Sequence, residues 1–187
     1  MMNPTSSLKN HFLIAMPNLS DPNFFRSVTL ICEHNEEGAM GIVVNHPTEV
    51  TTTELLDHLE IKVSHDFIER PVLAGGPVQT DRGFVIHRGG TDWQSSLMVN
   101  EQITITTSQD ILKAMPKQKS LNEAFVALGY AGWGPGQLEL EMAENSWLST
   151  PANADILFQT SVEQRWEKAA ALLGIDIAQI SSLSGHA

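Results

Sequence analysis

Short runs of apolar and β-branched residues recur through the first two thirds of the chain and predict strands. His11–Met16 is apolar and is closed by Pro17. Ser27–Glu33 and Ala39–Asn45 are rich in Val, Ile and Thr, and the Asn-Glu-Glu-Gly sequence before Ala39 predicts a hairpin with a four-residue turn. In that turn the glycine, Gly38, takes a positive φ. Further strands are predicted at Val72–Ala74, Gly83–His87, Ile103–Thr106 and Phe125–Tyr130.

The hairpin is the most apolar part of this pattern. We expect it at the centre of the sheet, because strands covered on both faces carry nearly continuous apolar runs. Its expected buried residues are Val28, Leu30, Ile42 and Val44.

Two helices are marked by N-terminal capping signals. Thr51 with Glu54 matches a capping box and precedes a leucine face formed by Leu55, Leu56 and Leu59. Thr107 with Asp110 opens a second helix, which stops at Pro116.

Two further helices are predicted nearer the C-terminus. Ser161 with Gln164 opens a helix whose apolar stripe runs from Trp166 to Leu173 and which ends at Gly174. Gln137–Glu144 alternates like a strand but is rich in good helix formers, and we predict a helix there.

Composition places the chain among ordinary globular proteins. It has 187 residues, of which 42% are hydrophobic, with 13 Gly. A chain of this length buries enough surface for one core without disulfides or metals. We expect one domain over residues 1–187, with a frayed tail from about residue 180.

The charge argues against nucleic acid as a partner. Lys and Arg number 11 against 22 Asp and Glu, a net charge of −11. Binding to DNA or RNA depends on cations that neutralise phosphates. The densest cationic group is Lys113, Lys117 and Lys119, which is a weak footprint.

The N-terminal sequence and the single cysteine predict a cytoplasmic protein. No apolar run approaches the about 18 residues of a membrane span, and the N-terminus lacks the pattern of a signal peptide. Cys32 is the only cysteine, so an internal disulfide is impossible. We therefore expect no membrane association.

Common catalytic motifs are missing from the sequence. It contains no serine in the nucleophile-elbow spacing, no phosphate loop and no His pair with the spacing of a zinc protease. We expect no catalytic residue set, no metal site and no cofactor.

One polar cluster surrounds the tip of the hairpin. A His beside carboxylates is typical of a general base or a metal ligand, and Glu33-His34 stands close to Glu36 and Glu37. A solvated acidic turn explains the cluster better. His58 and His65 are likewise expected at the surface.

A second cluster begins with Gly75-Gly76-Pro77 and continues through Asp81-Arg82 to His87. Paired glycines let the backbone approach another group closely, and an arginine can clamp a carboxylate or phosphate. The alternative is purely structural, with Asp81 and Arg82 fixing a turn before the strand at Gly83.

A third cluster is the glycine-rich segment from Gly129 to Gln137, which follows a strand and opens a predicted helix. Its backbone N–H groups are suited to an anion, and Trp133 to the wall of a site. A tight connection beside a closely passing strand explains the glycines slightly better.

Eight short segments, several of them already described, occur along the chain in a characteristic order. They are Phe12–Pro17, Asp21–Val28, Gly38–Asn45, Gly75–Val78, Asp81–Phe84, Gly129–Trp133, Gly136–Glu139 and Asn145–Leu148. In this order and spacing the chain resembles the AlgH/YqgE family of bacterial proteins. The resemblance implies an α/β fold of the α+β type: a curled, split, barrel-like and mostly antiparallel sheet with helices packed outside.

The resemblance implies less about function. The family name derives from a proposed role in regulating alginate synthesis, which suggests a transcription-related regulator, and no catalytic residues are assigned to it. We favour a binding or regulatory module for a small anion or a protein partner, without direct DNA binding. The alternative is an enzyme with His34 or His87 as base and Arg82 as anion clamp. The expected ligand-binding residues are Asn45, Gly75, Gly76, Arg82, His87, Gly132, Trp133 and Gln137. Of these, the two glycine segments and Arg82 should line one cleft, with Asn45 or Gln137 as a further polar contact.

Overall fold

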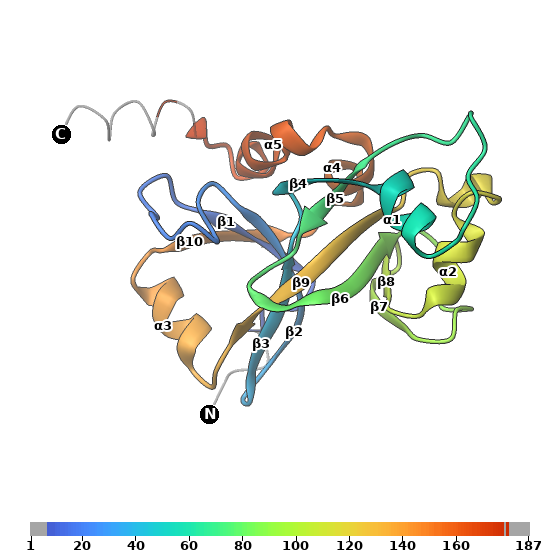
Figure 1. Ribbon diagram of the computed structural model, residues 1–187. Coiled ribbons are helices and arrows are strands. Elements are labelled where there is room, and N and C mark those ends of the chain that lie inside the picture. Colours follow the sequence, from blue (N-terminus) through green and yellow to red (C-terminus); the bar gives the residue numbers. More distant parts are fainter. Residues whose placement is uncertain (1–6, 178, 180–187) are drawn as a thin grey trace.

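The computed structural model describes residues 7–177 and 179, and in this part of the chain ten strands form one curled sheet (Figure 1). The strands are β1 (His11–Ala15), β2 (Val28–Asn35), β3 (Gly38–Val43), β4 (Pro47–Thr51), β5 (Pro71–Ala74), β6 (Val78–His87), β7 (Ser96–Asn100), β8 (Ile103–Thr106), β9 (Phe125–Trp133) and β10 (Trp147–Pro151). The main order is β10-β1-β2-β3-β9-β6-β8-β7.

The sheet divides at β9, which confirms the split, mostly antiparallel half-barrel. The later part of β9 pairs with β3, from Ala131 to Trp133, whereas its earlier part pairs in parallel with β5 at Ala127 and Leu128. Its other edge pairs antiparallel with β6. The chain thus curls around β9, and β4 extends β5.

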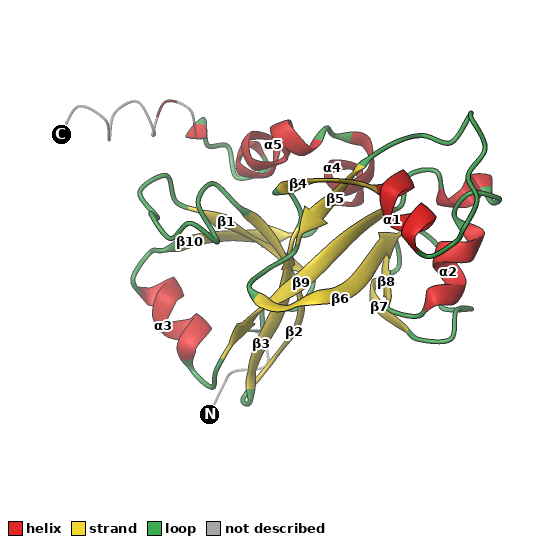
Figure 2. Cartoon of the chain, viewed as in Figure 1, coloured by secondary structure: helices red, strands yellow, loops and turns green. Residues whose placement is uncertain are grey.

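The helices cover both faces of this sheet (Figure 2). They are α1 (Thr52–His58), α2 (Gln109–Ala114), α3 (Gln137–Ala143), α4 (Ala154–Gln159) and α5 (Arg165–Ala171), with short 3-10 turns at Lys119–Leu121 and Val162–Gln164. The inner face and helices α4 and α5 share one core, which includes Phe12, Leu30, Phe84, Phe158 and Trp166.

The outer face carries two smaller cores. Leu138 of α3 packs with Trp133 and Trp147 at one end of the sheet. At the other end, Ile111 of α2 and Leu55 of α1 pack over Val85 and Val126. The strands alternate between the faces, so that Phe84 points inward and Val85 outward.

The predicted hairpin is confirmed as a buried unit of the sheet. Val28, Leu30, Ile42 and Val44 are fully buried in the inner core. The turn spans the four predicted residues: Asn35 pairs with Gly38 across the ladder, and Glu36 and Glu37 are the two residues that connect the strands. Gly38 does take a positive φ, of 131°.

Two of the predicted helix starts need correction. The Thr51 cap is confirmed, since its Oγ1 accepts a hydrogen bond from the Glu54 N–H at 3.1 Å. The N-cap of α2 is Ser108 and not Thr107, whose hydroxyl is directed to Ser95 Oγ at 2.9 Å. The helix predicted from Ser161 begins as a 3-10 turn before α5.

Two further predictions concern the C-terminal part of the chain. The α5 stripe is buried at Trp166, Ala169 and Ala170, but Leu173 lies beyond the helix and is 39% exposed. The tail predicted from about residue 180 lies outside the described residues. Of the helices described, none is long and apolar enough to cross a bilayer.

Candidate functional site

The candidate site is built on an irregular stretch of β6. Val78 pairs with Tyr130 and Gly83 with Leu128, so β6 carries more residues than β9 between these two pairs. Gln79 there has a positive φ of 45°. The interruption keeps Asp81 and Arg82 out of the β9 ladder, and bulges of this kind re-aim side chains near functional sites. The prediction that Asp81 and Arg82 form a turn ahead of the strand is therefore wrong, since both lie inside β6.

Arg82 and Phe84 share the inner face of β6 and line a pocket of about 190 Å³. We call it the barrel-mouth pocket. It is formed by Cys32, Met40, Arg82, Phe84, Ser95, Ser96, Leu97, Ile105 and Thr107. Most of its apolar members belong to the inner core, so the pocket is an opening into the half-barrel, with a rim of hydroxyl groups.

Arg82 is the cationic group of this pocket. Its guanidinium carbon lies 5.2 Å from the centroid of the Phe84 ring, and the side chain is exposed. Within the described chain it has no ion pair, so the structural expectation of a pairing with Asp81 or Asp21 is not met. Its charge is available to a ligand.

The hydroxyl groups at the rim are already ordered. Thr107 Oγ1 donates to Ser95 Oγ at 2.9 Å, and Ser96 Oγ lies 2.8 Å from Thr106 Oγ1. The Cys32 thiol lies at the apolar end of the pocket, where burial raises its pKa. It therefore behaves as an apolar group and not as a nucleophile.

Gly75 and Gly76 serve the close approach of two chain segments. The Gly75 N–H donates to Leu128 O at 2.7 Å, and its carbonyl accepts from the Val43 N–H at 2.8 Å. A Cβ at Gly76 would lie 2.1 Å from the carbonyl carbon of Tyr130. Their backbones are therefore packed against β9, as the structural interpretation of the glycines predicts.

Gly132, Trp133 and Gln137 lie around the end of β9. Trp133 is only 5% exposed and packs against Phe24 and Trp147, with ring centroids 6.1 and 6.3 Å away. Gln137 Oε1 accepts from the Gly134 N–H at 3.0 Å. Because Trp133 is buried and this N–H is occupied, the segment does not present the expected wall and donors to an open cleft.

Asn45 lies in a different region and has a structural role. Its Oδ1 accepts from the Val28 N–H at 2.8 Å, and its Nδ2 donates to the Arg26 carbonyl at 2.9 Å. Asn45 lines a shallow depression beside Trp166, whereas Arg82 lines the barrel-mouth pocket. The structure therefore does not gather the eight expected residues into one cleft, and any ligand binding by them stays a prediction.

His87 is buried on the outer face of the sheet, where its ring lies edge-on to that of Trp93. Its Nδ1 lies 2.8 Å from the Arg88 carbonyl and so carries the proton, while Nε2 accepts from the Thr106 hydroxyl at 2.7 Å. Burial lowers the pKa of His87 below its ordinary value, and burial also lowers that of His46.

These two lowered pKa values predict a loss of stability in mild acid. The neutral imidazole is favoured in the folded state, so its contribution is fully present above pH 6.5 and is lost as the pH falls through the lower folded pKa. Urea unfolding at pH 7.5 and 5.5 should give a smaller free energy at pH 5.5, and the difference should shrink in His87→Asn. Replacing the exposed His58 by Gln should leave the difference intact. An unchanged or rising stability of the parent in acid would contradict this.

His34 is also buried, so the expected solvated turn holds for Glu36 and Glu37 but not for this ring. Nδ1 of His34 accepts from the Leu8 N–H at 2.8 Å, and Nε2 lies 2.5 Å from Glu139 Oε1. The ring thus ties β2 to α3.

Comparison with known proteins identifies the fold family. The family model described as AlgH-like matches residues 12–178. The chain belongs to the AlgH-like family. It is 56% identical over its whole length to a UPF0301 protein of Thioalkalivibrio sulfidiphilus, of which it covers 100%. It is 48% identical to a UPF0301 protein of Vibrio vulnificus, with 97% of this chain and 100% of that protein covered.

Solved structures agree with this assignment. The AlgH solution structure from Pseudomonas aeruginosa matches with a TM-score of 0.76 and 43% identity, covering 97% of this chain and 96% of that one. A crystal structure from Corynebacterium diphtheriae matches with a TM-score of 0.73 at 18% identity, covering 96% and 94% of the two chains. The latter shows the shared AlgH-like fold alone.

For this AlgH-like chain, sequence reasoning found Arg82 but missed the residues around it. Phe84 follows two positions later in a strand, and this spacing alone places both side chains on one face. Ser95 and Ser96 gave no comparable signal, because they flank the start of β7, a strand that the apolar pattern does not mark.

Proposed function

We propose that this protein is a non-catalytic binding module whose barrel-mouth pocket takes a small organic anion, a carboxylate carried on a short apolar chain. The observation that carries the proposal is the position of Arg82: an exposed guanidinium without an ion pair in the described chain, at the rim of an apolar opening. A guanidinium suits a carboxylate because its donors match the two oxygens.

The pocket lining suits both the apolar chain and the carboxylate of such a ligand. Met40, Leu97 and Ile105 offer an apolar lining, while Ser95 offers a hydroxyl donor near the rim, because the Thr107 hydroxyl already donates to Ser95 Oγ. Its volume of about 190 Å³ is below the roughly 300–1,000 Å³ of sites for drug-sized molecules, which favours a small metabolite. The net charge of −11 supports leaving nucleic acid out of the proposal.

The enzyme alternative has less support. It requires His34 or His87 as a general base, and both ring nitrogens of each are already engaged. A base must reach the proton that it abstracts. Reversible binding requires only the cation and the apolar lining, and a ligand-dependent regulator would need no more from this chain.

Calorimetric titration with hexanoate tests the proposal. We expect a dissociation constant on the order of 1 mM for the parent protein. Arg82→Gln should weaken binding roughly tenfold or more, because a hydrogen bond to a charged group contributes about 1.5–3 kcal/mol.

The matched control is the neighbouring residue on the opposite face of β6. Asp81→Asn should bind hexanoate at least as tightly as the parent, since it removes a nearby negative charge without touching the pocket. Equal affinity of the parent and Arg82→Gln, or no binding by the parent at millimolar hexanoate, would contradict the proposal.

A further inference from the structure

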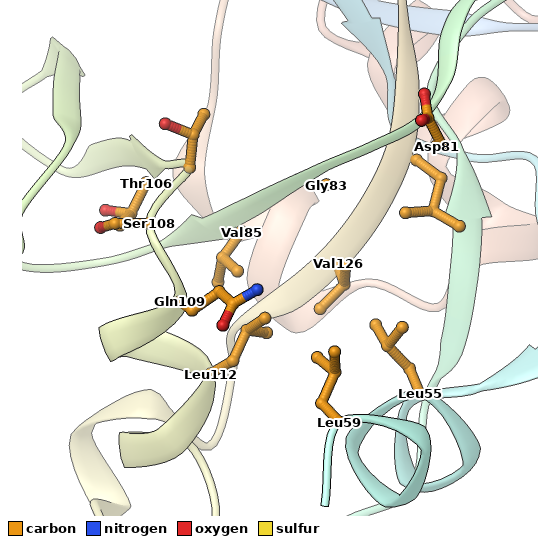
Figure 3. A pocket seen from close by; sticks show the side chains of 12 residues that line it. Leu55, Leu59, Asp81, Gly83, Val85, Thr106, Ser108, Gln109, Leu112 and Val126 are labelled. Atoms are coloured by element: carbon orange, nitrogen blue, oxygen red, sulfur yellow. The ribbon is translucent and has the colours of Figure 1, made fainter. Parts of the chain in front are cut away.

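A second pocket lies on the other face of β6, between α1 and α2 (Figure 3). We call it the helix groove, and its volume is about 200 Å³. Val85 and Val126 form the floor, Leu55 of α1 and Leu59 at its C-terminal end form one wall, and Leu112 of α2 forms the other. Its full lining is Leu55, Leu59, Asp81, Gly83, Val85, Thr106, Thr107, Ser108, Gln109, Leu112, Val126 and Leu128.

The two ends of the helix groove differ in chemistry. Asp81 stands at one end, on the bulged part of β6, and Figure 3 places it above the apolar floor. Thr106 and Ser108 lie at the far side, and the Gln109 side chain lies between Val85 and Leu112 in this view. The groove is therefore an apolar channel with one carboxylate end and one neutral polar end.

The Asp81 side chain is exposed and stands beside the apolar lining of the groove. Within the described chain its carboxylate has no ion pair or hydrogen bond. The other aspartate near the groove, Asp110, is different, because it accepts from the Gln94 N–H at 2.9 Å and from the Ser108 hydroxyl. Asp81 is thus the anionic group of the groove that is available to a ligand.

We propose that the helix groove is a second binding site, which takes a small primary or secondary amine carried on an apolar chain. The ammonium group would pair with Asp81, and the chain would lie on Val85 and Val126 between the leucines of α1 and α2. An ammonium is matched by a single carboxylate, and partial desolvation by the leucines strengthens such a pair relative to one in open water.

The site is separate from the barrel-mouth pocket, although only one strand divides them. Asp81, Gly83 and Val85 line the helix groove, whereas Arg82 and Phe84 line the barrel-mouth pocket. Because successive side chains of a strand point to opposite faces, Asp81 places a negative charge at the helix groove and Arg82 a positive charge at the barrel-mouth pocket. Thr107 lines both pockets, but the inference does not rest on the proposed anion site, since it is argued from Asp81 and the apolar groove and concerns a different ligand.

Titration with hexylamine tests this inference. The parent should bind hexylamine saturably, and Asp81→Asn should weaken binding at least tenfold. Arg82→Gln should bind it as the parent does. This pattern is the reverse of that expected for hexanoate, so failure of one site is distinguishable from failure of the other.

A second variant fills the groove without removing the carboxylate. A Cβ at Gly83 would have Leu128 Cδ2 as its neighbour at 3.8 Å, which is ordinary contact, so Gly83→Val fits the strand and narrows the groove. We expect it to keep the melting temperature of the parent and to lose hexylamine binding. Hexylamine binding that is the same in the parent, Asp81→Asn and Gly83→Val, or no binding by the parent at millimolar amine, would overturn the inference.

Discussion

Replacing Leu30 by aspartate should leave the chain unable to fold. Leu30 is fully buried in the inner core, in a strand paired with both Phe12 and Ile42. A buried carboxylate without a partner costs several kcal/mol, comparable with the roughly 5–15 kcal/mol that hold a domain folded. Circular dichroism and soluble yield measure the effect.

The matched control is Leu140→Asp, because Leu140 is 59% exposed on α3. This variant should fold with a free energy of unfolding within about 0.5 kcal/mol of the parent. A soluble Leu30→Asp protein with an unchanged melting temperature would place β2 outside the core and contradict the fold.

Arg165→Met should cause the second large loss of stability. Arg165 is 3% exposed, and its guanidinium donates to the carbonyls of Val44, Leu157 and Thr160 at 2.5, 2.7 and 3.3 Å. The side chain thereby joins the end of the hairpin to α4. Burial lowers its pKa to about 10, so the group is charged at neutral pH and depends on these carbonyls for stabilisation.

Removing the guanidinium leaves these buried acceptors unpaired, at about 1–3 kcal/mol each before relaxation. We expect a loss of about 3–5 kcal/mol in urea unfolding, and Arg165→Lys should recover little because an ammonium cannot reach all three carbonyls. Arg88→Met is the control: this partly exposed arginine pairs with Glu123 and Asp155, and its removal should cost less. Equal losses for Arg165→Met and Arg88→Met would contradict the bridging role.

The strands that the sequence predicts are those inside the sheet, and the strands that it misses lie mainly at its ends. The buried hairpin and β9 carry continuous apolar runs, because both of their faces are covered. In contrast, β7 and β10 are the two end strands of the main order, and β4 lies off it. An edge strand needs few apolar residues, and β10 even ends in Pro151.

In the candidate site, too, the sequence predicts what depends on neighbouring residues and misses what depends on distant ones. Arg82 was predictable as a candidate from its residue type and its neighbourhood of glycines. The burial of Trp133 depends on Phe24 and Trp147, which come from distant parts of the chain, so its aromatic character alone was misleading. The barrel-mouth pocket itself exists only once β6 lies beside β8 and β7 beyond it.

The most direct test of the proposed function is a methyl NMR titration with hexanoate, which locates the ligand. Met40 and Ile105 line the barrel-mouth pocket, whereas Met142 packs on the outer face with α3 and Ile156 belongs to α4. We expect saturable shifts of the Met40 and Ile105 methyl signals, little change at Met142 and Ile156, and loss of the shifts in Arg82→Gln. Shifts confined to methyl groups away from Met40 and Ile105, or shifts that persist in Arg82→Gln, would show that Arg82 does not form an anion site.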